Sequence, residues 1–229
     1  MDRLPQFNDL RSRFRARAAA LGGGLPSFFH DDLAAMKESA AKTRKIQGAF
    51  NVGDKLPADL ELVTPAGDKL SLNEIRKTKP VILVVFRGNW CPFCHLEIDF
   101  YVEATEMLRG LGAEIIALSP LPDAATVEYA QSKNAKFHMV GGESALKFME
   151  RFGLGYSPEA AFVESLKTVL GADLPQVYGT SQVTLAIPAT YVINTEGEVA
   201  YGMLSEDVTE RHALDEIAGA VIRTQRKRK

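Results

Sequence analysis

The sequence predicts an α/β protein whose central sheet is mixed but mostly parallel and carries helices on both faces. Short apolar segments alternate with amphipathic helical segments from residue 51 onward, as they do where helical crossovers join parallel strands. The chain has 229 residues, of which 46% are hydrophobic, and a formal net charge of -2. These values are ordinary for a globular protein with a sizeable core, and they disfavour both disorder and nucleic-acid coating.

Residues 1–50 are predicted to form an N-terminal helical extension, and residues 51–229 the main domain. Apolar side chains recur every three or four positions from Phe7 to Leu21, and a run of three glycines then ends the pattern. This spacing predicts an amphipathic helix followed by a hinge.

A second helix of the extension is expected to begin at Asp31 or Asp32, as its cap, and to run to Ile46. The apolar face of the extension should pack on the main domain or on a second copy of the chain. A homodimer is therefore worth testing.

The main domain is predicted to contain short strands at residues 60–63, 81–86, 114–118, 137–140, 190–193 and 198–204. Its helices are expected at residues 71–76, 92–111, 123–132, 143–152 and 208–223, with an irregular or helical insertion at residues 157–182. A turn motif at residues 194–197 joins the last two strands, which predicts a hairpin.

The expected compartment is the cytoplasm, with no membrane partner. The N-terminus is polar and charged, and no later segment approaches the roughly 18 apolar residues of a membrane helix. Cytoplasmic thiols are kept mostly reduced. A close pair of cysteines there is more naturally catalytic or metal-binding than a structural bridge.

Both cysteines lie in the string Trp90-Cys91-Pro92-Phe93-Cys94-His95, where a predicted buried strand ends and a helix begins. A sulfur at a helix start lies among unpaired N–H groups, so we expect a lowered pKa for the Cys91 thiol. Cys94 follows on the same helical face and can close a disulfide with it. Pro92 suits the first helical turn, and Trp90 and Phe93 are expected to flank the thiols with apolar surface that buries part of the site and docks an incoming partner.

Two other chemistries fit the cysteine pair less well. A structural zinc site needs four Cys or His ligands, and the histidines of this chain are scattered. The Cys-x-x-Cys-His spacing also matches covalent haem attachment, but that chemistry belongs to exported proteins of a different fold.

Pro188 stands directly before a β-branched apolar run. One interpretation is that it marks the start of a strand. The other is a cis-proline whose loop faces the thiols, which would leave the preceding backbone free to pair with a partner chain.

These motifs resemble the peroxiredoxin-like branch of the thioredoxin-fold superfamily, the branch of alkyl hydroperoxide reductases and thiol-specific antioxidant proteins. The resemblance covers roughly residues 50–222. It is carried by Val52-Gly53-Asp54-Lys55-Leu56-Pro57, Phe86-Arg87-Gly88-Asn89-Trp90, the cysteine string, and the segment from Ile187 to Gly197.

The resemblance implies a thioredoxin-like fold and a thiol-dependent redox enzyme without metal or organic cofactor. The substrate would be a hydroperoxide or a disulfide, and the reductant of the thioredoxin or glutathione type. A redox-sensing binding module with little turnover is a further alternative.

The resemblance leaves the roles of the sulfurs open. Matched to thioredoxins, Cys91 attacks and Cys94 resolves; matched to the peroxiredoxin pattern Thr-x-x-Cys with a later Glu, Cys94 attacks and Glu97 is its glutamate. Peroxiredoxins usually place an arginine near the thiolate where this chain has Pro188. Unless Arg87 supplies that guanidinium from the other side, peroxide activation loses a charge-assisted donor.

Overall fold

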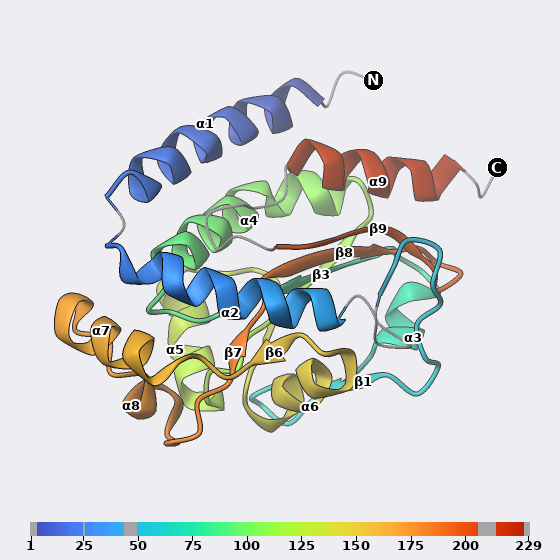
Figure 1. Ribbon diagram of the computed structural model, residues 1–229. Helices are drawn as coiled ribbons and strands as arrows, with labels where there is room; N and C mark the ends of the chain where they lie inside the picture. Colours follow the sequence, from blue (N-terminus) through green and yellow to red (C-terminus); the bar gives the residue numbers. More distant parts are fainter. Residues whose placement is uncertain (1–3, 25, 44–49, 206–213, 227–229) are drawn as a thin grey trace.

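The computed structural model describes residues 4–24, 26–43, 50–205 and 214–226. Five strands form its central sheet in the order β5-β4-β3-β8-β9 (Figure 1). They are β3 (Val81–Val85), β4 (Glu114–Leu118), β5 (His138–Val140), β8 (Ala189–Ile193) and β9 (Val199–Leu204). β3, β4 and β5 are parallel, and β8 is antiparallel to both β3 and β9. Only β8 therefore opposes the other four, as the predicted mostly parallel sheet requires.

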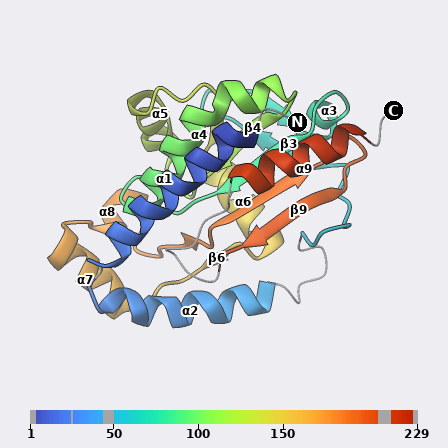
Figure 2. The same cartoon turned by 90° about the horizontal axis from the view of Figure 1, so that it is seen from above.

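Helices cover both faces of this sheet, and β3 and β8 are accordingly buried along their whole length. α4 (Pro92–Gly110) and α9 (Leu214–Arg226) lie on one face, with α1 (Leu4–Gly22) across them (Figures 1 and 2). α6 (Gly142–Phe152) lies on the other face. Between β4 and β5 the chain forms α5 (Asp123–Ser132). This layered arrangement confirms the predicted fold class.

Smaller elements surround the sheet. β1 (Glu61–Val63) and β2 (Lys69–Ser71) pair as an antiparallel hairpin ahead of α3 (Leu72–Arg76). The insertion contains α7 (Ala160–Leu170) and α8 (Leu174–Tyr178), and the short strands β6 (Gly155–Tyr156) and β7 (Leu185–Ala186) lie on either side of it. Its helices agree with the sequence prediction, but β2, β6 and β7 were not predicted because two or three residues carry too little pattern.

The N-terminal extension packs on the main domain. Phe14 of α1 meets Phe100 of α4 edge-on, with ring centroids 5.4 Å apart. The second helix, α2 (Phe28–Thr43), lies against α7, where the Phe28 and Phe162 centroids are 5.8 Å apart. Packing on the main domain is thus confirmed, while a dimer stays a prediction.

The predicted start of α2 was wrong. The helix begins at Phe28, three residues before Asp31, and Asp32 is buried inside it instead of capping it. Its predicted end at Ile46 and the predicted start of the C-terminal helix at Val208 lie outside the described residues. Within the described ranges, no helix is long and apolar enough to cross a bilayer.

Candidate thiol site

The two cysteines lie where the sequence placed them, at the junction of β3 and α4. Cys91 is the N-cap residue of α4, and Pro92 occupies its first turn. Both cysteines are thiols, and both are 0% exposed. The Cys91 carbonyl accepts the His95 N–H at 3.0 Å, which begins the helical hydrogen bonding. Each sulfur is therefore enclosed at the positive end of a 19-residue helix.

A buried polar cluster surrounds Arg87, four residues before Cys91. The Arg87 side chain is 0% exposed, and its Nη2 donates to Asp32 Oδ2 at 3.0 Å. The same nitrogen donates to the Tyr156 hydroxyl and lies 3.1 Å from the Met36 sulfur. The Tyr156 hydroxyl donates in turn to Asp32 Oδ2 at 2.8 Å. One loop, α2 and β6 thus meet in a closed triangle of hydrogen bonds.

The Arg87 guanidinium keeps its charge in this setting. Burial lowers the pKa of Arg87, but four ionisable neighbours more than offset that effect and raise the pKa above its ordinary value. These neighbours are Tyr156, Asp32, Cys91 and Cys94. A negative charge on either sulfur would therefore interact favourably with the guanidinium.

Two donors of this guanidinium are unsatisfied. Nε and Nη1 of Arg87 are buried and have no hydrogen-bond partner in the described part of the chain. A buried unpaired donor costs free energy, and such exceptions are enriched at functional sites. Here they belong to a charged group beside two thiols.

A second set of bonds holds the backbone of Arg87 and the ring of Trp90. The Tyr178 hydroxyl donates to the Arg87 carbonyl at 2.7 Å and accepts from Trp90 Nε1 at 2.8 Å. The Ser119 hydroxyl donates to the same carbonyl at 3.1 Å. Trp90 is half-buried and anchored by this bond, while its role in shaping the site stays a prediction.

The remaining residues of the cysteine helix are mostly enclosed. Glu97 is 4% exposed, one helical turn beyond Cys94. His95 contacts the Asn89 carbonyl and lies 3.3 Å, Nδ1 to hydroxyl, from Tyr129. Phe93 is fully buried. The expectation that Phe93 offers apolar surface to a partner was therefore wrong.

Pro188 also departs from one prediction. All described peptide bonds are trans, so the cis-proline interpretation was wrong. The backbone around Pro188 is already paired: the Ile187 N–H donates to the Leu154 carbonyl at 2.9 Å, and the Pro188 carbonyl accepts from Ser205 at 2.8 Å. β8 starts at the next residue, opposite Val85. Pro188 marks a strand start, at the end of the sheet from which the Arg87 loop emerges.

Sequence reasoning missed Asp32, Tyr156 and Tyr178. Asp32 was interpreted as a helix cap, Tyr156 directly precedes the insertion, and Tyr178 lies within it, both without a recognisable motif. A charged residue buried in an amphipathic helix, and tyrosines that need a partner for their hydroxyl, are faint signals of a polar cluster. The partners are visible only in three dimensions.

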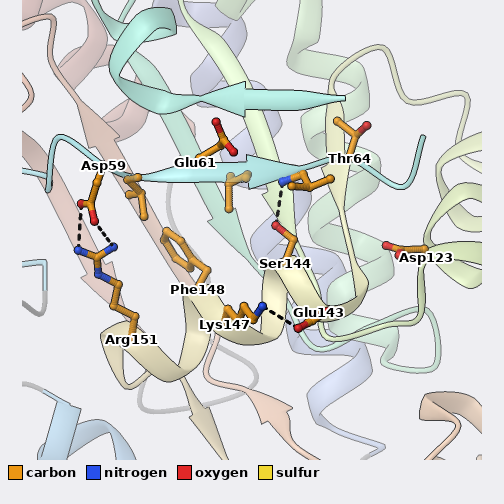
Figure 3. A pocket seen from close by; sticks show the side chains of 12 residues that line it. Asp59, Glu61, Thr64, Asp123, Glu143, Ser144, Lys147, Phe148 and Arg151 are labelled. Carbon is orange, nitrogen blue, oxygen red and sulfur yellow. Dashed lines mark hydrogen bonds and ion pairs between the residues drawn. The ribbon is translucent and has the colours of Figure 1, made fainter. Parts of the chain in front are cut away.

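A separate groove lies between β1 and α6, and none of the predicted site residues lines it. It has a volume of about 370 Å³. Two ion pairs lie along it, Asp59 with Arg151 and Glu143 with Lys147, and the Ser144 hydroxyl accepts the Val63 N–H at 2.8 Å (Figure 3). The paired surface charges there supply no nucleophile. The thiols with Arg87 are therefore the candidate site.

The model of the AhpC/TSA family matches residues 52–202. A search of curated proteins finds no match.

Solved structures with the same fold include the peroxidoxin BcpB from Mycobacterium tuberculosis, with 17% identity, a TM-score of 0.56, and coverage of 79% of this chain and 99% of that one. A peroxiredoxin-like protein from Aquifex aeolicus has 20% identity, a TM-score of 0.56, and coverage of 78% and 90%. Reduced Prx3 from Vibrio vulnificus has 15% identity, a TM-score of 0.58, and coverage of 75% and 98%.

Proposed function

Since the chain belongs to the AhpC/TSA family, and is accordingly an oxidoreductase of the peroxidase type, we propose that it reduces hydroperoxides through a dithiol–disulfide cycle of Cys91 and Cys94. The observation that carries this proposal is the buried Arg87 guanidinium, which has two unsatisfied N–H donors and interacts electrostatically with both sulfurs. It supplies the charge-assisted donor that this family usually places where the chain has Pro188.

In the first step, the Cys91 thiolate attacks one oxygen of the hydroperoxide. The O–O bond breaks, an S–O bond forms, and the leaving oxygen takes a proton to become an alcohol or water. Cys91 is the attacking residue because it is the N-cap of α4, where the helix end favours a thiolate. Arg87 donates to the peroxide oxygens as negative charge develops on them.

In the second step, Cys94 attacks the Cys91 sulfenic acid. The S–S bond forms, the S–O bond breaks, and the hydroxyl leaves as water with the proton of Cys94. Two electrons from a thioredoxin- or glutathione-type thiol then reduce the disulfide and restore both thiols. Trp90, Pro92 and Glu97 enclose the site during this cycle, and no metal or organic cofactor takes part.

Reduction of protein disulfides is the second candidate, because Cys91 and Cys94 have the spacing of a thioredoxin motif. The burial of both cysteines favours a hydroperoxide as the substrate. A partner's disulfide sulfur must reach the attacking sulfur, whereas both cysteines are 0% exposed. A small hydroperoxide needs far less room.

The decisive experiment is a parallel assay of the native chain, Cys91→Ser, Cys94→Ser and the double variant with hydrogen peroxide and with a model disulfide, each with a dithiol reductant. We expect the native chain to consume peroxide and Cys91→Ser to fall to the level of the double variant. Cys94→Ser should still be oxidised once without forming an intramolecular disulfide.

Two outcomes would contradict the proposal. Peroxide consumption by the native chain no faster than by the double variant would exclude a peroxidase cycle, and turnover of the disulfide alone would favour the second candidate. If Cys94→Ser loses the first oxidation and Cys91→Ser keeps it, the two sulfurs exchange roles. A partner affinity that changes on oxidation without turnover would favour a redox-sensing module.

A further inference from the structure

We propose that the N-terminal extension is part of the thiol site, and that Asp32 of α2 is a positioning residue that holds the Arg87 guanidinium beside Cys91 and Cys94. The inference rests on the proposed function for the reaction that it serves. The inference goes beyond that function because Asp32 lies outside residues 52–202, the segment that matches the family model. The carboxylate that binds Arg87 therefore comes from outside the segment that matches the family.

The geometry of the cluster carries the proposal. Asp32 Oδ2 accepts from Arg87 Nη2 at 3.0 Å and from the Tyr156 hydroxyl at 2.8 Å. The guanidinium bonds Asp32 and the Tyr156 hydroxyl through Nη2 alone, so Nε and Nη1 are left as unsatisfied donors. Asp32 therefore fixes the orientation of Arg87 without using the donors that a peroxide would need.

The helix that carries Asp32 is itself held on the insertion. α2 contacts α7 and β6, and Tyr156 of β6 is the third member of the cluster. Met36, one turn after Asp32, is buried against the same Arg87 nitrogen. α2 and β6 thus meet at Arg87 and help to bury its side chain.

Asp32 has opposite effects on two properties of the site. Its negative charge opposes thiolate formation nearby, yet its hydrogen bonds aim the guanidinium that activates the peroxide. The ionisable groups that face Arg87 come from several elements, and they are Asp32, Tyr156, Tyr178, Cys91 and Cys94. Removing the charge of Asp32 should make the thiols ionise more readily while the peroxide reaction becomes slower.

The test compares Asp32→Asn with the native chain and with Asp59→Asn, which removes the same charge from an exposed arginine pair. Iodoacetamide alkylation across pH, located on each cysteine by peptide mass spectrometry, measures thiolate formation. Stopped-flow oxidation by hydrogen peroxide measures activation. Urea unfolding establishes that each variant is folded.

For Asp32→Asn we expect the alkylation profile to move to lower pH and the peroxide rate constant to fall at least about tenfold, even at a pH where the thiol is fully ionised. Asp59→Asn should change neither. Tyr156→Phe, which keeps the charge but loses one hydrogen bond to Arg87, should slow the peroxide reaction without moving the profile, and it decides the question if Asp32→Asn does not fold.

A peroxide rate that is unchanged in Asp32→Asn, or that rises in step with the thiolate fraction, would overturn the proposal. If the native chain does not react with peroxide at all, the proposed function fails and the alkylation profile alone decides. A shift confined to Asp32→Asn then still supports contact between Asp32 and the thiol site, and an unmoved profile refutes it.

Discussion

Two arginine–aspartate pairs in this molecule have the same chemistry and opposite surroundings. Arg87 and Asp32 are buried, with side chains 0% and 1% exposed, and lie beside the thiols. Arg151 and Asp59, along the groove in Figure 3, are 44% and 74% exposed. In water an ion pair gains little, because solvent screens it and each partner is already well hydrated. In the interior, each charge depends on the other.

The difference indicates what each pair is for. A buried pair is often no more stabilising than well-packed apolar side chains of the same volume, so stability is a poor reason to keep one. The Arg87–Asp32 pair also leaves polar atoms unsatisfied, namely Asp32 Oδ1 and two arginine nitrogens. Such a cost is understandable where the arginine acts on the neighbouring thiols. The exposed pair carries no comparable cost.

The largest expected effect comes from breaking the buried pair. Asp32→Leu leaves the Arg87 charge without its carboxylate and should lower the free energy of unfolding by about 3–5 kcal/mol. The double variant Arg87→Met/Asp32→Leu replaces both charges by apolar groups and should regain most of that loss. Urea unfolding followed by circular dichroism measures both changes.

The same double variant separates stability from activity. It should react with hydrogen peroxide far more slowly than the native chain, although it is nearly as stable. A double variant that regains both stability and peroxide reactivity would make the pair purely structural.

A smaller effect is expected from the hydrogen bonds that hold the arginine backbone. Tyr178→Phe removes a hydroxyl that donates to the Arg87 carbonyl and accepts from Trp90. The loss leaves the half-buried Trp90 N–H without this partner and the Arg87 carbonyl with the Ser119 hydroxyl alone, and we expect a cost of about 1–3 kcal/mol. Trp90 is the one tryptophan of the chain, so its fluorescence reports on this site alone. An unchanged emission spectrum in Tyr178→Phe would contradict the bond to Trp90.

Alkaline pH should lower the free energy of unfolding through the buried tyrosines near the thiol site. Burial raises the pKa of Tyr129, Tyr156 and Tyr178 above the ordinary value of 10.0. Above that pH the unfolded chain releases protons that the folded chain keeps, so the free energy of unfolding falls as pH rises. Each tyrosine contributes about 1.4 kcal/mol per pH unit.

The contribution of one tyrosine can be isolated with Tyr156→Phe. Its free energy of unfolding should fall less steeply between about pH 10 and pH 11 than that of the native chain, by about 1 kcal/mol, because the unfolded tyrosine is only half ionised at the start of this interval. Equal slopes for the two proteins would mean that Tyr156 ionises as easily in the folded state as in the unfolded chain.

The sequence could predict the cysteine part of the site but not the polar cluster around Arg87. The strand, the helix and the spacing of Cys91 and Cys94 are local patterns, and the structure contains each of them. Asp32 and Tyr156 lie 55 and 69 positions away from Arg87 and 124 positions away from each other. No local sequence pattern connects residues that far apart. Their meeting depends on how α2 packs on the insertion. The hydrogen bonds that pair the backbone on both sides of Pro188 likewise join segments distant in the sequence.

The smallest expected effect completes the comparison, at the exposed pair. The hydrogen bond from Arg151 lowers the pKa of Asp59, so the pair stabilises the fold at neutral pH, and this contribution is lost as pH falls through the lowered pKa. Solvent and salt screen the interaction. Asp59→Asn should therefore leave the urea midpoint at neutral pH unchanged within error, at low and at high salt. A loss approaching that of Asp32→Leu would mean that breaking an arginine–aspartate pair is costly whether or not the pair is buried. The argument that the buried pair serves the thiols would then lose its physical basis.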